Sequence, residues 1–251
     1  MTKLQIVYED DAVVAVNKPA GLATIPGRAE ETSVLEQLGH QLGLPVKGET
    51  DPRVRVVHRL DKDTSGVLLF AKTIEAQRDL SHQFQNNTAE KRYVALVIGR
   101  PPMPEGEVDA PIAPDKQHVG AMKIDKRGKP ARTAWRVVET FRDLTLVYAM
   151  PKTGKTHQIR VHLQQIGHPL AVDPLYGPTA DEKGPGVFLS KFKRGYQLGK
   201  YQDERPLISR LTLHAEKLRI TLPGGATVEI IAELPRDMAT TLKMLRKYGQ
   251  G

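Results

Sequence analysis

The sequence predicts an α+β protein with a mostly antiparallel sheet. Segments typical of strands outnumber those typical of helices, many strands come in pairs joined by tight turns, and the two kinds of segment do not alternate regularly. Regular alternation would have favoured a doubly wound parallel sheet. At 251 residues the chain is long enough for one large domain or two small ones.

In the N-terminal half, β-rich runs bounded by polar turns predict strands at residues 4–8, 13–16, 54–60, 67–71 and 93–98. The first two form a hairpin around an acidic turn. Apolar residues at helical spacing predict two helices, one through Leu35, Leu38 and Leu42 and one through Ala76, Leu80 and Phe84. Thr32 and Ser33 are candidate N-caps of the first helix, because a hydroxyl can accept a backbone N–H.

In the C-terminal half, two further hairpins are predicted, from strands at residues 135–138 with 144–148 and at 211–221 with 227–233. A helix at residues 156–166 follows from the spacing of Ile159, Leu163 and Ile166, and Gly167 and Pro169 end it. The last predicted helix carries Met238, Leu242 and Leu245.

The composition restricts the class of protein. Lys plus Arg number 37 and Asp plus Glu 29, which gives a net charge of +8. This excess favours a polyanionic partner, nucleic acid first, although scattered surface cations give the same sum. The absence of cysteine excludes disulfides and thiolate chemistry and fits a reducing compartment. Without an apolar signal core or a run of roughly 18 apolar residues, we expect neither export nor a membrane span.

The run HRLDKDTSG at residues 58–66 is the first candidate site. A strand end that delivers Asp61 into a turn can present a carboxylate on a rigid support, as nucleophilic or general-base catalysis requires. The same residue types also form an ordinary Asx-turn, so this run alone does not show whether Asp61 is catalytic or only part of a turn. His58 and Asp61 have no third ligand nearby, and no metal site is predicted.

The run PKTGKTHQIRVHL at residues 151–163 is the second candidate. On a helix, His157 and Arg160 share one face, while Leu163 belongs to the face that meets the core. Arg160 then points toward the interior, although most arginines on helices are exposed at the surface.

The same run also resembles a phosphate-binding P-loop, because Ala149 is followed by four residues and then by Gly154-Lys155-Thr156. Ala149 stands where the glycine-based pattern wants glycine, Pro151 stiffens the loop, and regular βαβ units are missing. A nucleotide hydrolase would bind ATP or GTP with magnesium and lose that binding in Lys155→Ala.

Together, three motifs resemble those of the RluA-type pseudouridine synthases. They are HRLD with TSG at 58–66, KRYVALVIG at 91–99 and THQIRVHL at 156–163, and the similarity reaches from residues 6–10 and 17–21 to 213–215. Several long motifs in this order are far more specific than any one of them. The resemblance implies the pseudouridine synthase fold, a mixed, largely antiparallel sheet flanked by helices and loops. Many relatives carry a small N-terminal RNA-binding domain, but here the similarity starts near Leu4, so we expect a single catalytic domain over residues 1–251 with no N-terminal accessory RNA-binding domain.

The resemblance also implies roles for individual residues. Asp61 would be the catalytic carboxylate, Tyr93 would pack against the target uracil and assist proton removal, and Arg160 would pair with Asp61 and favour its ionised form. Arg59 would fill the gap left by a flipped nucleotide. The family's reaction detaches uracil from ribose C1′, rotates it and rejoins it through C5 without a cofactor.

Further substrate-binding residues are expected among His58, Lys18, Lys152, Lys155, His157 and Leu163. Lys155 stands where the family more often has Arg, which removes the bidentate fork, so no specific hydrogen bond is expected there. The implied partner is structured RNA, rRNA or tRNA, with no role for DNA or a membrane, and we expect a cytoplasmic monomer. A non-catalytic RNA-binding module is the competing hypothesis, against which Asp61, Tyr93 and Arg160 count.

One irregular segment, residues 178–206, is longer than usual for the family. Cations and aromatic rings interleave there, which suits unpaired bases. A solvated loop is equally compatible with this composition. We expect a substrate-specific RNA contact from its cations and rings, Lys183, Lys191, Lys193, Arg194, Lys200, Phe188, Phe192, Tyr196 and Tyr201.

Overall fold

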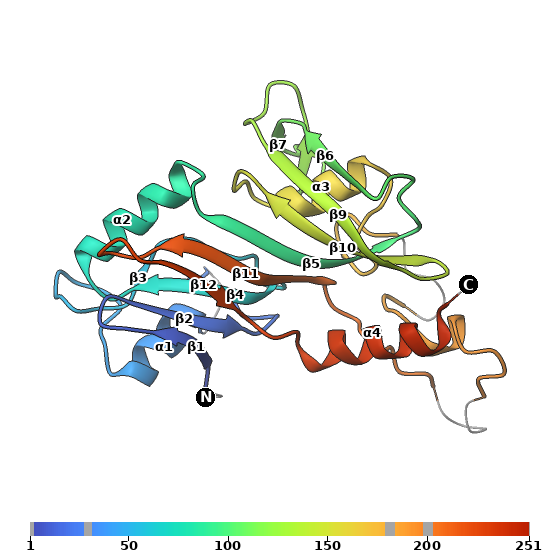
Figure 1. The fold of residues 1–251 in the computed structure, drawn as a ribbon, viewed down its shortest axis with the longest axis horizontal. Helices are drawn as coiled ribbons and strands as arrows, with labels where there is room; N and C mark the ends of the chain where they lie inside the picture. Colours follow the sequence, from blue (N-terminus) through green and yellow to red (C-terminus); the bar gives the residue numbers. More distant parts are fainter. Residues whose placement is uncertain (1–2, 28–31, 179–183, 198–202, 251) are drawn as a thin grey trace. The chain divides into compact units, whose positions relative to one another are not determined.

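A computed structural model describes residues 3–27, 32–178, 184–197 and 203–250 (Figure 1). The chain forms two compact units, one of Met1–Tyr93 with His214–Glu233 and one of Val94–Leu213 with Leu234–Gly251. Each unit is therefore assembled from two separate stretches of the sequence. In the described part of the chain, no helix has the length and apolar character needed to cross a bilayer. The single catalytic domain expected from the sequence stays a prediction.

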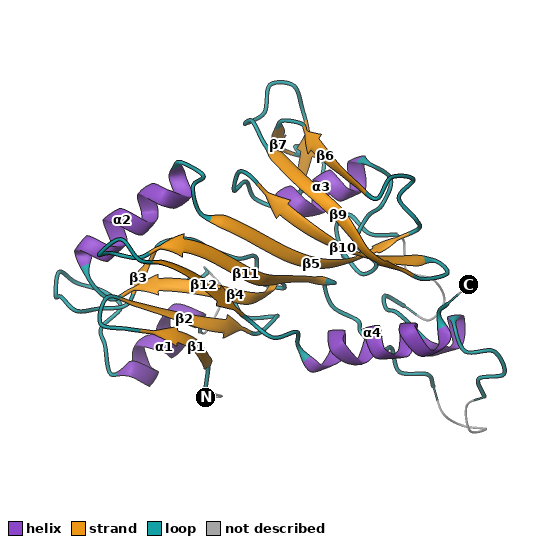
Figure 2. Ribbon diagram, in the orientation of Figure 1, coloured by secondary structure: helices purple, strands orange, loops and turns teal. Residues whose placement is uncertain are grey.

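The first unit is built on a mixed sheet (Figure 2). Its strands β1 (Gln5–Glu9), β2 (Val13–Lys18), β4 (Ser65–Ala71) and β11 (Leu213–Thr221) are neighbours in that order, β12 (Thr227–Ile231) pairs with β11, and β3 (Arg55–Val56) pairs with β4. The pairing of β4 with β11 is parallel, and the other pairs are antiparallel. The predicted α+β class with a mixed, largely antiparallel sheet is confirmed.

Strand β4 explains how this unit builds its core on both faces of the sheet. Val67, Leu69 and Ala71 pack into one apolar cluster and Leu68 and Phe70 into another, since successive side chains of a strand point to opposite faces. All seven residues of β4 are buried. The candidate site follows from this, because the loop that carries Asp61 leads directly into the most buried strand of the unit.

Helices α1 (Val34–Leu42) and α2 (Ile74–Gln85) belong to this unit and begin at side-chain caps. Ser33 accepts the N–H of Glu36, and Thr73 accepts the N–H of Ala76. Of the two predicted caps of the first helix, Ser33 is therefore the one that acts. Gly43 ends α1 with φ at +66°, which a residue without a Cβ adopts most easily.

In the second unit, β5 (Glu90–Ile98), β10 (Leu144–Pro151), β9 (Arg132–Thr140) and β6 (Glu105–Asp109) are neighbours in that order. The first residues of β5, up to Tyr93, belong to the first unit. A separate hairpin is formed by β7 (Ile112–Pro114) and β8 (Met122–Ile124). The helices are α3 (Gln158–Gln165), the short 3₁₀ helix η1 (Leu189–Lys191) and α4 (Arg236–Tyr248), whose apolar side joins the core of this unit.

Candidate active site

Asp61 lies in the loop between β3 and β4, and the backbone on both sides of it is held. The hydroxyl of Thr24 donates to the carbonyl of Leu60 at 2.9 Å and accepts the Leu60 N–H at 3.2 Å. On the other side, the N–H of Gly21 donates to the carbonyl of Lys62 at 2.9 Å. The partly exposed Asp61 is thus presented from a turn whose two neighbouring residues are fixed.

Lys18 supports the same turn from inside the protein. Its side chain is fully buried, and Nζ donates to the carbonyls of Pro19, Leu22 and Lys62 at 2.9, 2.7 and 2.7 Å. A protonated lysine has three N–H donors, so three carbonyls match its capacity. The burial of Lys18 counts against its predicted contact with the RNA backbone, which stays a prediction, and its three bonds tie the loop after β2 to the Asp61 turn.

The exit from this turn into β4 is also fixed. The hydroxyl of Ser65 donates to Nδ1 of His214 at 3.0 Å, because Nε2 of that ring donates to the carbonyl of Ala232 at 3.0 Å. Gly66 has φ at +120°, and a Cβ at this position would overlap the backbone of Ala215 on the parallel neighbour β11. Only glycine permits this close approach.

Tyr93, on β5, belongs to the same unit as Asp61. Burial raises the pKa of its hydroxyl, and the negative charge of Asp61 raises the pKa further. The two side chains are therefore brought within electrostatic reach of each other, as the motifs predict. A neutral phenol can pack against a base and donate a hydrogen bond, whereas a phenolate that removes a proton is disfavoured at this position.

His58 is held by the scaffold. Its ring stacks on Phe84 with centroids 4.3 Å apart, and Nε2 accepts the backbone N–H of Leu69 at 3.0 Å. Burial, and secondarily the charge of Lys91, lowers the pKa of the imidazole to about 3. The prediction that His58 binds substrate is not supported by these contacts, which join the Asp61 loop to β4 and α2.

His58 should make stability depend on pH. The unfolded histidine takes up a proton near pH 6.5, whereas the folded pKa is about 3, so the unfolded state binds more protons between these values. Stability is therefore present above pH 6.5 and is lost as the pH falls toward 3. Lowering the pH from 7 to 5 should cost about 2 kcal/mol through this group.

Urea unfolding at a series of pH values tests this expectation. His58→Gln should flatten the dependence between pH 7 and 5 by about 2 kcal/mol. The exposed His40 on α1 provides the matched control, His40→Gln, which should leave the wild-type slope in place. Equal slopes for the wild type and His58→Gln would show that this histidine does not titrate as its surroundings imply.

In the second unit, Gln158 organises the loop that enters α3. Its Oε1 accepts from the Thr153 hydroxyl at 2.7 Å and from the Lys155 N–H at 3.0 Å, and its Nε2 donates to the Arg132 carbonyl and the Thr133 hydroxyl, both at 2.9 Å. The Lys155 N–H is thus used inside the loop, and β10 runs antiparallel to β9. The P-loop interpretation is wrong, since that motif needs its amide groups for phosphate and a parallel βα unit.

Arg160, on α3, is buried and forms a bidentate ion pair with Asp173. Its Nε and Nη2 donate to the two carboxylate oxygens of Asp173, both at 2.7 Å, and the two side chains are 6% and 0% exposed. Oδ1 of Asp173 also accepts the N–H groups of Leu175 and Tyr176, which fixes the carboxylate. Asp173 is a residue of this site that no predicted motif includes, although its Asp-Pro step before Tyr-Gly indicates a turn.

Tyr176 connects Arg160 with His157. The guanidinium carbon of Arg160 lies 4.9 Å from the centroid of the Tyr176 ring, and the Tyr176 hydroxyl is 2.8 Å from Nδ1 of His157. The same hydroxyl accepts the Met122 N–H at 2.6 Å. His157, with φ at +55°, directly precedes α3, and its predicted contact with substrate stays a prediction.

The other residues predicted to bind substrate differ in how exposed they are. Leu163 is 1% exposed and lies in the interior, which counts against its predicted contact with substrate, and that contact stays a prediction. Arg59 and Lys152 are exposed, and Lys155 is partly buried. The expected pairing of Asp61 with Arg160 joins residues of different units and stays a prediction.

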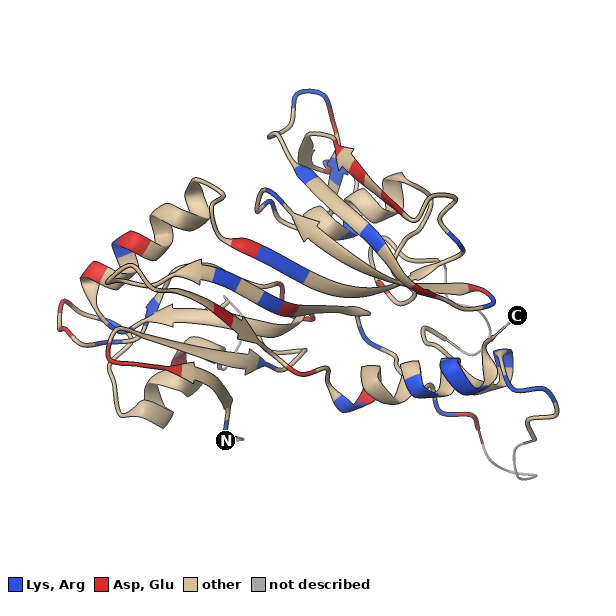
Figure 3. Ribbon diagram, viewed as in Figure 1, with Lys and Arg blue, Asp and Glu red and all other residues tan. Residues whose placement is uncertain are grey.

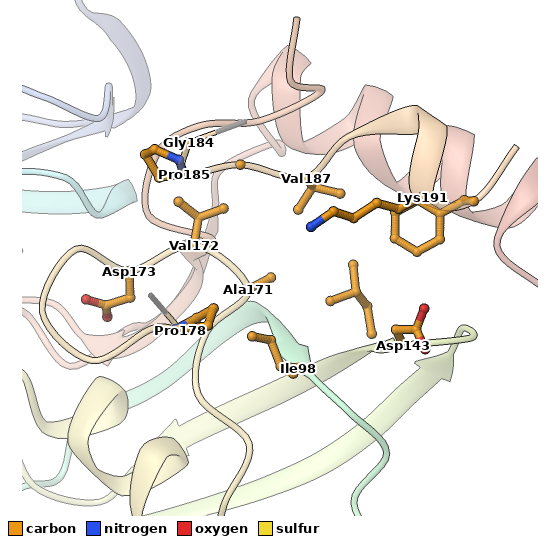
Figure 4. A pocket seen from close by; sticks show the side chains of 13 residues that line it. Ile98, Asp143, Ala171, Val172, Asp173, Pro178, Gly184, Pro185, Val187 and Lys191 are labelled. Atoms are coloured by element: carbon orange, nitrogen blue, oxygen red, sulfur yellow. The ribbon is translucent and has the colours of Figure 1, made fainter. Parts of the chain in front are cut away.

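A cavity of about 320 Å³ lies in the second unit, and Asp173 contributes to its wall (Figure 4). Most of the lining is apolar, including Ile98, Val172 and Val187, and the charged side chains on its wall are Asp143, Lys191 and Asp173. The carboxylate that holds Arg160 is therefore next to a space large enough for a small molecule.

Comparison with known proteins shows the family of this chain. The family model described as RNA pseudouridylate synthase matches residues 12–165, more than half of the chain. The ribosomal large subunit pseudouridine synthase D of Nitrosomonas europaea is 41% identical over 244 residues, which cover 97% of this chain and 65% of that protein. The uncharacterized RNA pseudouridine synthase YlyB of Bacillus subtilis is 39% identical, with 98% of this chain and 74% of that protein covered.

A solved structure of a human protein has a similar fold. Human RNA pseudouridylate synthase domain containing 4 superposes with a TM-score of 0.70 at 26% identity and covers 96% of this chain and 93% of that one. The RluA-type resemblance of the motifs is thereby confirmed. The chain belongs to the family of RNA pseudouridylate synthases, isomerases that act on uridine in RNA.

Proposed function

We propose that this protein is an RNA pseudouridine synthase that isomerises specific uridines of structured RNA, with Asp61 as its catalytic carboxylate. The observation that carries the proposal is the Asp61 turn. Both neighbours of Asp61 are fixed by hydrogen bonds, and the pKa of the nearby Tyr93 responds to the charge of Asp61. A carboxylate on a rigid support beside a neutral ring is what the isomerisation of a pyrimidine requires.

The reaction balances without a cofactor. The N1–C1′ bond of uridine breaks, the uracil turns, and a C5–C1′ bond forms, while the C5 proton passes to solvent and N1 takes up a proton. Asp61 would act on the sugar or base in its ionised form, and Tyr93 would pack against the ring. Arg160 would supply positive charge, and the exposed Arg59 would stack in the space that the flipped nucleotide leaves.

The names of the relatives and the exposed cations indicate which RNA is the substrate. Relatives named for the large ribosomal subunit favour its rRNA as the first candidate, with tRNA as the second. The exposed Lys152, and Lys155 beside it, would contact phosphates and make affinity fall with salt. We propose a monomer that works in the cytoplasm, where such RNA is found.

Tritium release from RNA that carries 5-tritiated uridine tests the proposal. A synthase should release tritium from a transcript of the large-subunit rRNA or from tRNA, since only isomerisation exchanges the C5 hydrogen. The non-catalytic RNA-binding module, the competing function, would bind the same transcripts and release none. Binding without release from both RNAs would therefore refute the proposed activity.

A further inference from the structure

Helix α4 presents a basic outer side. Met238, Leu242 and Leu245 face the core of the second unit, whereas four cations on α4, Arg236, Lys243, Arg246 and Lys247, are exposed. Lys and Arg recur along this helix in Figure 3, and its one acidic residue, Asp237, lies in the first turn. None of the catalytic motifs includes this helix.

A turn from the irregular segment meets the end of α4. The N–H of Tyr196 donates to the carbonyl of Lys193 at 3.2 Å, and Gly195 inside the turn has φ at +67°. Nζ of Lys193 lies 5.4 Å from the centroid of the Tyr248 ring and 5.7 Å from that of Tyr196. Nζ of Lys247 lies 5.1 Å from the same Tyr248 ring.

Two ammonium groups from segments about fifty residues apart in sequence are therefore gathered around one ring. We call this surface the Tyr248 basic face and define it by Lys193, Arg194, Tyr196, Lys243, Lys247 and Tyr248. Cation–π attraction offsets part of the repulsion between the two ammonium groups. An anion bound between them would offset the rest.

Acidic groups near this surface have other partners. Asp237 forms a bidentate pair with Arg210, and Glu139 pairs with Arg246. Within the described ranges, no ion pair is formed by the four cations Lys193, Arg194, Lys243 and Lys247. The attraction of α4 cations to the helix dipole does not account for the cluster, because Lys193 and Arg194 are not on the helix.

We propose that the Tyr248 basic face, which includes no residue of the catalytic motifs, binds the phosphate backbone of the RNA substrate. The inference rests on the proposed function, which supplies the polyanion. A membrane surface is the poorer fit, since the apolar side chains of α4 are buried in the core and its described residues include no exposed large hydrophobic one. Of the segment expected to contact RNA, Lys193, Arg194 and Tyr196 are here, while Lys183, Lys200 and Tyr201 lie outside the described residues.

The test uses the full chain and the variant Lys193→Gln/Lys243→Gln/Lys247→Gln. RNA affinity is measured by fluorescence anisotropy between 50 and 300 mM salt. The slope of log K against log salt should fall by about 2 to 3, and affinity near 0.1 M salt should fall at least roughly tenfold. The matched control removes three exposed cations of the first unit, Lys3→Gln/Lys47→Gln/Arg78→Gln, and should keep the wild-type slope.

The outcomes separate this inference from the proposed function. Equal salt slopes for the glutamine variant and its first-unit control would overturn the RNA-binding role of the Tyr248 basic face. Tritium release by the wild type would still support the proposed function. No tritium release by the wild type would overturn the function. The variant Lys193→Arg/Lys243→Arg/Lys247→Arg keeps all three charges and should keep the wild-type slope. A smaller slope in this variant would show that the substitutions act through the fold and not through charge, which would overturn the assignment. Displacement by polyglutamate as effective as by RNA would indicate an acidic protein partner and also overturn it.

Discussion

Asp61→Asn is expected to abolish tritium release, with a fall in kcat on the order of 10⁴-fold or more. The amide has the size and shape of the carboxylate but carries no charge, so it can neither attack carbon nor accept a proton as a base. The turn that holds residue 61 depends on Thr24, Gly21 and Lys18 through backbone groups, and the substitution leaves all of these contacts in place.

The chain offers a matched control two residues away. Asp63 is an exposed carboxylate in the same loop, and Asp63→Asn removes the same charge from the surface. Its turnover should stay within a small factor of the wild type. The two variants should bind RNA with similar affinity, because each lowers the negative charge of the loop by one. Turnover by Asp61→Asn within tenfold of the wild type would remove this carboxylate from the mechanism.

Local structure could be predicted from the sequence wherever it depends on the residues of a single short segment. The hairpin of β1 with β2, the cap at Ser33 and the α3 helix follow from turn residues, a hydroxyl and apolar spacing. The expected strand at 54–60 was wrong beyond Val56, because Thr24 takes the backbone groups of Leu60. Strands β7 and β8 are not predicted because runs of three residues carry too little pattern, and β6 is not predicted because its residues EGEVD are mostly acidic or glycine.

The candidate site shows where sequence reasoning stops. Asp61, Tyr93 and Arg160 can be named from the sequence because their motifs are long and ordered, and their catalytic roles stay predictions. The contacts of Lys18 and His58 inside the protein could not be predicted, because a sequence shows that a side chain can be charged but not that carbonyls or a ring will enclose it. These facts depend on segments that are distant in sequence.

Removal of the Asp173 carboxylate, in Asp173→Ala, should destabilise the protein by about 3–5 kcal/mol and abolish turnover. The substitution leaves the Arg160 guanidinium buried, with the partner of its Nε and Nη2 gone. The surface pair of Arg210 with Asp237 has the same bidentate geometry but side chains 21% and 37% exposed. Asp237→Ala is therefore the matched control, with an expected cost of about 1 kcal/mol or less, because water can replace the lost partner.

A double variant separates a positioning role from a structural one. In Asp173→Ala/Arg160→Met no buried charge remains, so its stability should exceed that of Asp173→Ala, measured by urea unfolding. Turnover should nevertheless stay absent, because the cation is missing. A double variant that regains tritium release would show that Asp173 and Arg160 serve folding alone. Asp173→Ala with normal kcat would show that Arg160 finds its position without the carboxylate, and the part assigned to Asp173 would then have to be given up.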